Sequence, residues 1–219
     1  MNYWRGVVRA GMFAACVAAV GGVSGCWLAA AYERSQGKAV DAVYRGIDNK
    51  SVAVVVWTQQ GVDFEYPQAR KEISAFVAKY FHQNMATVRL LDYREVLRWQ
   101  DDTLNWQNLM EKDWGKHFGV DRVVSIDLLR YDTREPGALD FLHGRLVATA
   151  KVFEVDAPGA TASWQQDFDV SWPDTEPLGP GQGDETTVRI HLLDSFGSKL
   201  VNCFYDHREL DPTIREKAP

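Results

Sequence analysis

Three pairs of carboxylates are close enough in this sequence to carry acid–base chemistry. They are Asp101 with Asp102, Asp132 with Glu135, and Asp167 with Asp169. Two neighbouring carboxylates can serve as general acid and general base, which is the chemistry of a hydrolase. However, Asp167 and Asp169 alternate with apolar residues along a predicted strand, so we expect their face to be solvated. Since no Gly-x-Ser-x-Gly motif is present either, the sequence predicts no enzyme, and a carboxylate hydrolase remains the alternative.

Metal and phosphate chemistry are not favoured by the spacing of the other polar residues. The five histidines, none in a metal-binding spacing, are His82, His117, His143, His191 and His207. A glycine-rich loop at 179–183 precedes a predicted helix, where backbone N–H groups could hold a phosphate. Asp184 and Glu185 at that helix start would instead satisfy these donors and repel an anion. We therefore expect no cofactor and no metal.

Cysteine chemistry is predicted at Cys26 alone. Arg5 and Arg9 precede an apolar run, and Val23-Ser24-Gly25 supplies small residues before Cys26, as in a signal that is cleaved. The stretch Val23–Cys26 looks like a bacterial lipobox, which implies that residues 1–25 are removed and that Cys26 carries acyl chains such as palmitate. Cys203, flanked by apolar residues, is expected to be a buried structural thiol without a disulfide partner.

A retained membrane helix is the alternative for the first segment. No charged residue lies between Arg9 and Glu33, and about 20 apolar residues are enough to span a bilayer. The run is rich in Ala and Gly, which partition weakly, so cleavage and lipidation are favoured. By resemblance to lipoprotein sorting signals, Trp27 after the cysteine favours the outer membrane, with the folded part in the periplasm.

The charge of the chain excludes one class of partner. After removal of residues 1–25, which include two arginines and no acids, 22 Lys and Arg stand against 30 Asp and Glu, a net charge of −8. Such a surface repels phosphate backbones, so nucleic-acid binding is not expected. The length that remains fits one domain with a sizeable core.

The pattern of apolar residues places that domain at 50–205, between a tether at 26–49 of moderate helix propensity and a polar tail at 206–219. Strands are predicted at 51–59, 87–93, 121–132, 144–156 and 162–172. Helices are predicted at 67–84, at 94–100 as a single turn, from a cap at Asn105 to a stop at Gly119, and at 185–205. Residues 173–183 are expected to be a loop.

This order, β-α-β-α-β-β-β-α, predicts an α/β fold with one five-stranded mixed sheet. The run SVAVVVWTQ at 51–59 is typical of a central strand that is covered on both faces. Helical crossovers make the first three strands parallel, and short links make the last three an antiparallel meander. Helices are expected to pack on the sheet.

Three stretches resemble one superfamily of envelope proteins. They are VAVVVWTQ at 52–59, VRLLDYREVL at 88–97 and WGKHFGVDRVVSIDLL at 114–129. The superfamily includes the amino-terminal domain of the Tol-system propeller protein, the curli-secretion channel subunit and the lipoprotein activators of penicillin-binding proteins. Trp57-Thr58 stands where the family often has Pro-Phe, and Ser125 where a glycine is common. The resemblance implies an envelope scaffold, channel subunit or protein activator.

A channel is disfavoured because the inserts at 60–66 and 133–142 are too short to supply two bilayer-spanning strands each. We therefore expect a lipid-anchored envelope protein that binds another envelope protein or helps to assemble it. Trp99, just before Asp101, and Trp172, beside the 173–183 loop, interrupt polar surroundings and are the predicted partner-binding residues.

Overall fold

The structure, a computed structural model, describes residues 37–134, 137, 140–159, 161–174 and 176–209. Ala42–Tyr205 forms one compact unit, and the described residues before and after it belong to a second. Residues 1–36 lie outside the described residues and include Cys26 and the first part of the predicted tether; residues 210–219 of the predicted tail lie outside them as well. Among the residues that are described, no helix is both long enough and apolar enough to cross a bilayer.

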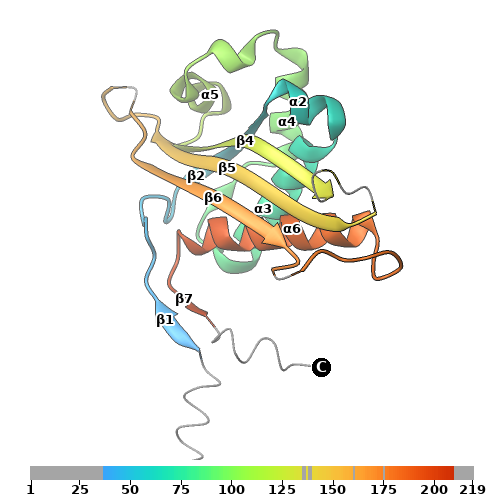
Figure 1. The fold of residues 1–219 in the computed structure, drawn as a ribbon. Helices are drawn as coiled ribbons and strands as arrows, with labels where there is room; N and C mark the ends of the chain where they lie inside the picture. The colour runs from blue at the N-terminus through green and yellow to red at the C-terminus, as the bar shows by residue number, and fades with distance from the viewer. Residues whose placement is uncertain (1–36, 135–136, 138–139, 160, 175, 210–219) are drawn as a thin grey trace, which may run out of the picture. The chain divides into compact units, whose positions relative to one another are not determined.

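The Ala42–Tyr205 unit alternates strands and helices before it ends in a meander and a long helix (Figure 1). Its first half contains β2 (Ser51–Thr58), α2 (Gln60–Glu65), α3 (Ala69–Asn84), β3 (Arg89–Leu90), α4 (Tyr93–Asp102), the short 3-10 helix η1 (Trp106–Asn108) and α5 (Glu111–Phe118). Its second half contains β4 (Arg122–Arg134), β5 (Leu142–Glu154), β6 (Trp164–Trp172) and α6 (Glu185–Asn202). The predicted fold class is confirmed; only the six-residue helix α2 has no predicted counterpart.

The five strands form one mixed sheet in the order β3-β2-β4-β5-β6. Strand β2 is parallel to both β3 and β4, whereas β5 is antiparallel to both β4 and β6. Helical crossovers separate the parallel strands and shorter connections join the meander, which is the physical reason for both arrangements. The predicted strand directions are therefore confirmed.

Strand β2 is buried on both faces, as its unbroken apolar sequence predicts. Val52, Val54 and Val56 face the larger core cluster, and Ala53 and Val55 face a second, smaller one. This alternation follows from the two-residue period of a strand. The central strand thus separates two layers of helices, which is the arrangement on which the fold prediction depended.

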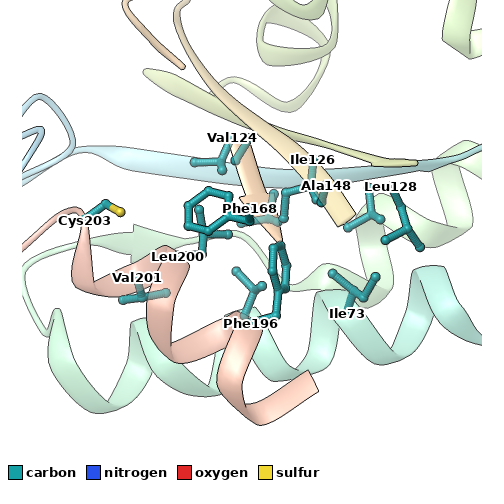
Figure 2. Packing of buried hydrophobic residues seen from close by; sticks show 14 of the residues in the cluster. Ile73, Val124, Ile126, Leu128, Ala148, Phe168, Phe196, Leu200, Val201 and Cys203 are labelled. Atoms are coloured by element: carbon teal, nitrogen blue, oxygen red, sulfur yellow. The ribbon is translucent and has the colours of Figure 1, made fainter. Parts of the chain in front are cut away.

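The larger core lies between the sheet and the helices α3 and α6. Figure 2 shows Ile126, Leu128 and Phe168 of the sheet directed toward Ile73 of α3 and Phe196 of α6. The rings of Phe168 and Phe196 meet edge to face, with centroids 5.6 Å apart. The apolar stripe predicted for the last helix is buried in full; it consists of Val188, Leu192, Phe196, Leu200 and Cys203.

A glycine sets the distance between the two helices of this layer. A Cβ atom added at Gly197 of α6 would lie 2.9 Å from Tyr80 Cδ2 and 3.3 Å from the Phe76 carbonyl oxygen of α3. Any larger residue at this position would have to push the helices apart. The close packing of α3 on α6 therefore depends on Gly197.

The smaller core lies on the other face of the sheet, under α4 and α5, and two sequence predictions are wrong there. The single turn predicted at 94–100 is a ten-residue helix, because Asp92 caps it by accepting a hydrogen bond from the Arg94 N–H at 2.9 Å. The helix predicted from Asn105 is broken, because Asn105 adopts a left-handed conformation with φ 57° and makes no cap hydrogen bond. Only η1 follows, and α5 begins at Glu111.

The second unit contains a two-stranded sheet that the sequence did not predict. Strand β1 (Lys38–Val40) pairs antiparallel with β7 (His207–Glu209). The described residues 37–49 of the predicted tether contain this strand and no helix, so their moderate helix propensity does not produce a helix. Likewise, residues 207–209 of the predicted polar tail are ordered as a strand.

Candidate functional site

The connection between α4 and α5 exposes more large apolar side chains than any other short stretch of the described chain. Leu104 is 92% exposed, Leu109 46% and Met110 60%. The five other exposed large apolar residues are far apart in the sequence; they are Val43, Phe64, Leu129, Phe141 and Ile190. A concentration of exposed apolar side chains is typical of an interaction site. We call Trp99, Leu104, Leu109 and Met110 the α4–α5 surface.

Trp99, one of the two predicted partner-binding residues, belongs to a group of packed rings beneath this surface. Its ring lies parallel to that of His117, with centroids 5.3 Å apart, and meets Phe118 edge to face at 5.0 Å. It also contacts Trp106 at 6.0 Å. Trp99 is half-buried, so one part of its ring packs against α5 while another part is accessible. We call Trp99, Trp106, Trp114, His117 and Phe118 the aromatic cluster.

The aromatic cluster fixes the backbone that carries the exposed residues. Trp106 and Trp114 are buried with their rings 5.5 Å apart, and Trp114 Nε1 donates a hydrogen bond to the Trp106 carbonyl oxygen at 3.1 Å. Leu109 and Met110, between these two tryptophans, have extended backbone conformations that interrupt the helical path. Because both ends of the connection are anchored in the core, Leu109 and Met110 are held at the surface.

A buried amide attaches α4 to the central strand. Gln100, next to Trp99, is 4% exposed and donates a hydrogen bond from Nε2 to the Val56 carbonyl oxygen at 3.0 Å. Sequence reasoning missed this residue, although the helical turn predicted at 94–100 already contains both Val96 and Gln100. Residues four apart lie on the same face of a helix, so the apolar Val96 was the signal that could have indicated a buried Gln100.

The ionic surroundings of the α4–α5 surface are acidic and only partly neutralised. From Trp99 to Glu111 the chain has three carboxylates and no basic residue, and the exposed Arg98 directly precedes this stretch. Asp101 pairs with Arg70 of α3 at 2.7 Å. No ion-pair partner for Asp102 or Glu111 is found among the described residues. Lys112, the next residue, is buried and donates a hydrogen bond to the Ala157 carbonyl oxygen at 2.6 Å. Its ammonium group therefore forms no ion pair with Glu111.

Trp172, the other predicted partner-binding residue, lies at a different place in the unit. It ends β6 and stacks on His191 of α6, with ring centroids 4.3 Å apart and planes at 12°. Trp172 therefore packs on the α6 side of the sheet, whereas Trp99 packs against α5 on the other side. The structure does not bring the two tryptophans together, and no large exposed apolar group adjoins Trp172 in the sequence.

Ion pairs or hydrogen bonds within the sheet engage three of the carboxylates that could have supported a hydrolase, namely Asp132, Asp167 and Asp169. Asp167 and Asp169 are exposed on β6, as expected; Thr149 donates to Asp167 at 2.7 Å, and Arg145 donates to both oxygens of Asp169 at 3.0 and 2.6 Å. Lys151 pairs with Asp127 at 2.8 Å, and Arg130 pairs with Asp132. Glu135 lies outside the described residues. We call these side chains of β4, β5 and β6 the polar sheet face.

Electrostatics on the polar sheet face favour the ionised carboxylates. The hydrogen bonds from the Arg145 guanidinium, together with its positive charge, lower the pKa of Asp169 below the ordinary value. A general acid at neutral pH would need a raised pKa instead. Asp169 is therefore suited to a stable ion pair and not to proton donation.

The start of α6 is occupied by protein groups, as the sequence predicts for the glycine-rich loop. Asp184 accepts a hydrogen bond from the Thr187 N–H at 2.7 Å, which lowers its pKa. Glu185 accepts from Thr133 Oγ1 at 2.7 Å and pairs with Arg134 at 2.9 Å. These contacts attach α6 to the end of β4. Sequence reasoning did not foresee them, since β4 was expected to end before Thr133.

The remaining candidate groups have structural roles or lie outside the described residues. Burial raises the pKa of Cys203 to about 11, so its thiol is protonated at neutral pH. Within the described ranges, no group of three or more His, Cys, Asp or Glu side chains is arranged to hold a metal ion. The predicted lipid-attachment residue, Cys26, lies outside the described residues and stays a prediction.

Comparison with known proteins adds a likeness in structure only. No model of a known protein family matches the sequence, and no curated protein matches it. Similar solved structures include the PelC dodecamer from Paraburkholderia phytofirmans (12% identity, 75% of this chain and 96% of that chain covered, TM-score 0.44). Another is the lipoprotein GNA1162 from Neisseria meningitidis (14% identity, 69% of this chain and 98% of that chain covered, TM-score 0.44). A third is a minor lipoprotein from Acinetobacter baumannii (11% identity, 70% of this chain and 91% of that chain covered, TM-score 0.37). At these values the likenesses carry no argument about function.

Proposed function

We propose that this protein is a lipid-anchored, non-enzymatic protein of the bacterial envelope, attached through Cys26 to the outer membrane with its folded unit in the periplasm. Its function is to bind another envelope protein or to help assemble it. The observation that carries the binding role is the α4–α5 surface, where Leu104, Leu109 and Met110 are exposed over a packed aromatic cluster. The anchor rests on the sequence Val23–Cys26.

The energetics of the exposed groups support binding as the purpose of this surface. Burial of apolar area is favourable by roughly 25 cal/mol per Å². A partner that covers the exposed side chains of Leu104 and Met110 would gain this free energy on binding. Trp99 adds a large ring whose rotamer is already fixed by its contacts with His117 and Phe118, so little entropy is lost on binding. Such a surface is organised before a partner arrives.

Labelling with palmitate tests the anchor. The full chain and its Cys26→Ala and Cys203→Ala variants are expressed in a bacterial host with labelled palmitate. We expect label in the full chain and in Cys203→Ala, because the Cys203 thiol is buried, and no label in Cys26→Ala. Label retained by Cys26→Ala contradicts the lipid anchor.

Cross-linking in intact cells followed by purification tests the binding role. The anchored full chain should be recovered with an envelope protein, in a quantity that grows with the expression of that partner. Recovery of the chain alone at several expression levels contradicts the binding role. The two tests are independent, because a chain anchored at Cys26 can still lack a partner.

A further inference from the structure

We infer that the α4–α5 surface binds a segment of a partner protein in which lysine or arginine residues alternate with apolar ones. This inference rests on the proposed function and goes further, because it names the surface and the chemistry of the partner. It follows from two independent properties of the same stretch of chain: its exposed apolar side chains and its unneutralised carboxylates.

The apolar part of the contact is formed by Leu104, Leu109 and Met110. They flank η1, whose Trp106 is buried, so each exposed side chain is only a few residues from a fixed point of the core. Trp99 of α4 is half-buried, and its ring contacts that of Trp106, the buried residue between Leu104 and Leu109. A segment with several apolar side chains on one side can cover this area, and methionine adapts to varied shapes.

The acidic part of the contact selects the charge of the partner. Asp102 lies two residues before Leu104, and Glu111 directly follows Met110, so a carboxylate stands at each end of the apolar stretch. Neither carboxylate has an ion-pair partner in the described part of the chain. A segment that brings Lys or Arg to these two positions gains two new ion pairs, and charge complementarity also speeds association.

The same charges disfavour two other occupants. An anionic lipid surface would attract cationic residues, but the stretch from Trp99 to Glu111 has three carboxylates and no basic residue. A second copy of this chain, bound through the same surface by two-fold symmetry, would place like-charged carboxylates near one another. A cationic segment of another protein meets neither repulsion.

A binding experiment with defined peptides tests the inference. The full chain in discs of zwitterionic lipid is titrated against a fluorescent Leu/Lys amphipathic peptide of about 18 residues, long enough for several helical turns, and against its Leu/Glu counterpart. Empty discs supply the blank. We expect the Leu/Lys peptide to bind in excess of the blank and the Leu/Glu peptide not to bind.

Three double variants divide the contact into its parts. Leu104→Ser with Met110→Ser, and Asp102→Asn with Glu111→Gln, should each weaken peptide binding by about tenfold or more, the size of a hot-spot loss. The matched control Asp167→Asn with Asp169→Asn removes the same number of carboxylates from the polar sheet face, and it should leave the affinity unchanged. All six positions are at least partly exposed, so the fold is retained.

Each contrary result overturns the inference in a different way. If the control variant weakens peptide binding equally, the affinity depends on the net charge of the chain and not on the α4–α5 surface. Three other results show that the occupant of the α4–α5 surface is not a cationic segment. They are binding of the Leu/Glu peptide, self-association of the chain through Leu104 and Met110, and insertion of these two side chains into discs of anionic lipid. If cross-linking in cells still captures an envelope protein, the proposed function stands and only the surface or its chemistry is wrong.

Discussion

The α4–α5 surface and the polar sheet face both expose carboxylates, but they differ in what neutralises them. On the polar sheet face, Asp127, Asp132 and Asp169 each pair with a cation of the same sheet, and Asp167 accepts from Thr149. On the α4–α5 surface, Asp102 and Glu111 have no such partner among the described residues, and exposed apolar groups lie between them. The carboxylates of the first region are engaged within the sheet, whereas Asp102 and Glu111 are not paired in the described part of the chain.

Exposure and charge alone therefore do not indicate a binding site. Strands place side chains of neighbouring strands opposite one another, so acids and bases on β4, β5 and β6 readily form cross-strand pairs. In the connection between α4 and α5, by contrast, Asp102 and Glu111 form no ion pair with a described residue. Its apolar groups and carboxylates remain available, and this is the reason for assigning the binding role to it.

The largest expected effect on stability comes from the support beneath the α4–α5 surface. Trp114→Ala should lower the free energy of unfolding by about 3–5 kcal/mol, because it leaves a cavity in the smaller core and removes the hydrogen bond to Trp106. Thr149→Ala on the polar sheet face should cost far less. Urea unfolding of the full chain measures both, and equal losses contradict the view that the aromatic cluster supports this surface.

The next effect concerns the packing of α5 on the sheet. A Cβ atom at Gly115 would lie 2.3 Å from Val155 Cγ2 and 2.9 Å from Val123 Cγ2. Gly115→Ala should therefore destabilise the chain by about 1–3 kcal/mol through overpacking. Gly61→Ala in α2, where nothing lies within 4 Å of the added atom, is the matched control and should be neutral or slightly stabilising. Thermal unfolding that ranks the two variants in the opposite order contradicts the packing described here.

A smaller, pH-dependent effect is expected on the polar sheet face. The pKa of Asp169 is lower in the folded chain than in the unfolded one, because Arg145 bonds to the carboxylate. The pair therefore stabilises the fold above the unfolded pKa, near 3.9, and this contribution is lost as the pH falls through the folded value. The stability difference between the wild type and Asp169→Asn should shrink between pH 6 and pH 3, as measured by urea unfolding. A difference that grows toward pH 3 has the wrong sign for this ion pair.

The smallest effect on stability is expected at the α4–α5 surface itself. Leu104→Ser should change the free energy of unfolding by no more than about 0.5 kcal/mol, because a side chain that is 92% exposed buries little apolar area on folding. Its effect on partner capture should nevertheless be large. Calorimetry and cross-linking of the same variant measure the two quantities, and a strongly destabilised variant shows that Leu104 serves the fold and not a partner.

Much of the fold could be predicted because strong local patterns and topology agree. The apolar run of β2, the stripe of α6 and the lengths of the connections determined the strand directions and both helix layers. The break at Asn105 could not be predicted in this way, because tryptophan, methionine and phenylalanine at four-residue spacing fit a continuous helix. Tertiary packing of Trp106 and Trp114 overrides that periodicity.

The candidate site was predicted only in part for the same reason. Trp99 was predicted as a partner-binding residue because it is a large apolar residue beside two acids, and the structure shows it half-buried against Trp106. Leu104, Leu109 and Met110 were missed because a continuous helix would have buried Met110 with its neighbours. For Trp172, the ring contact with His191 comes from a helix about 20 residues later, a non-local contact that spacing cannot reveal.

Photo-cross-linking from the two contrasting regions tests the central claim most directly. The amino acid p-benzoylphenylalanine is placed at position 104 or at position 167 of the full chain, and cells are irradiated before the chain is purified. We predict a cross-link to another envelope protein from position 104 and none from position 167, with the captured peptide containing basic and apolar residues. A cross-link from position 167 alone, or equal yields from both positions, contradicts the assignment of the binding role to the α4–α5 surface.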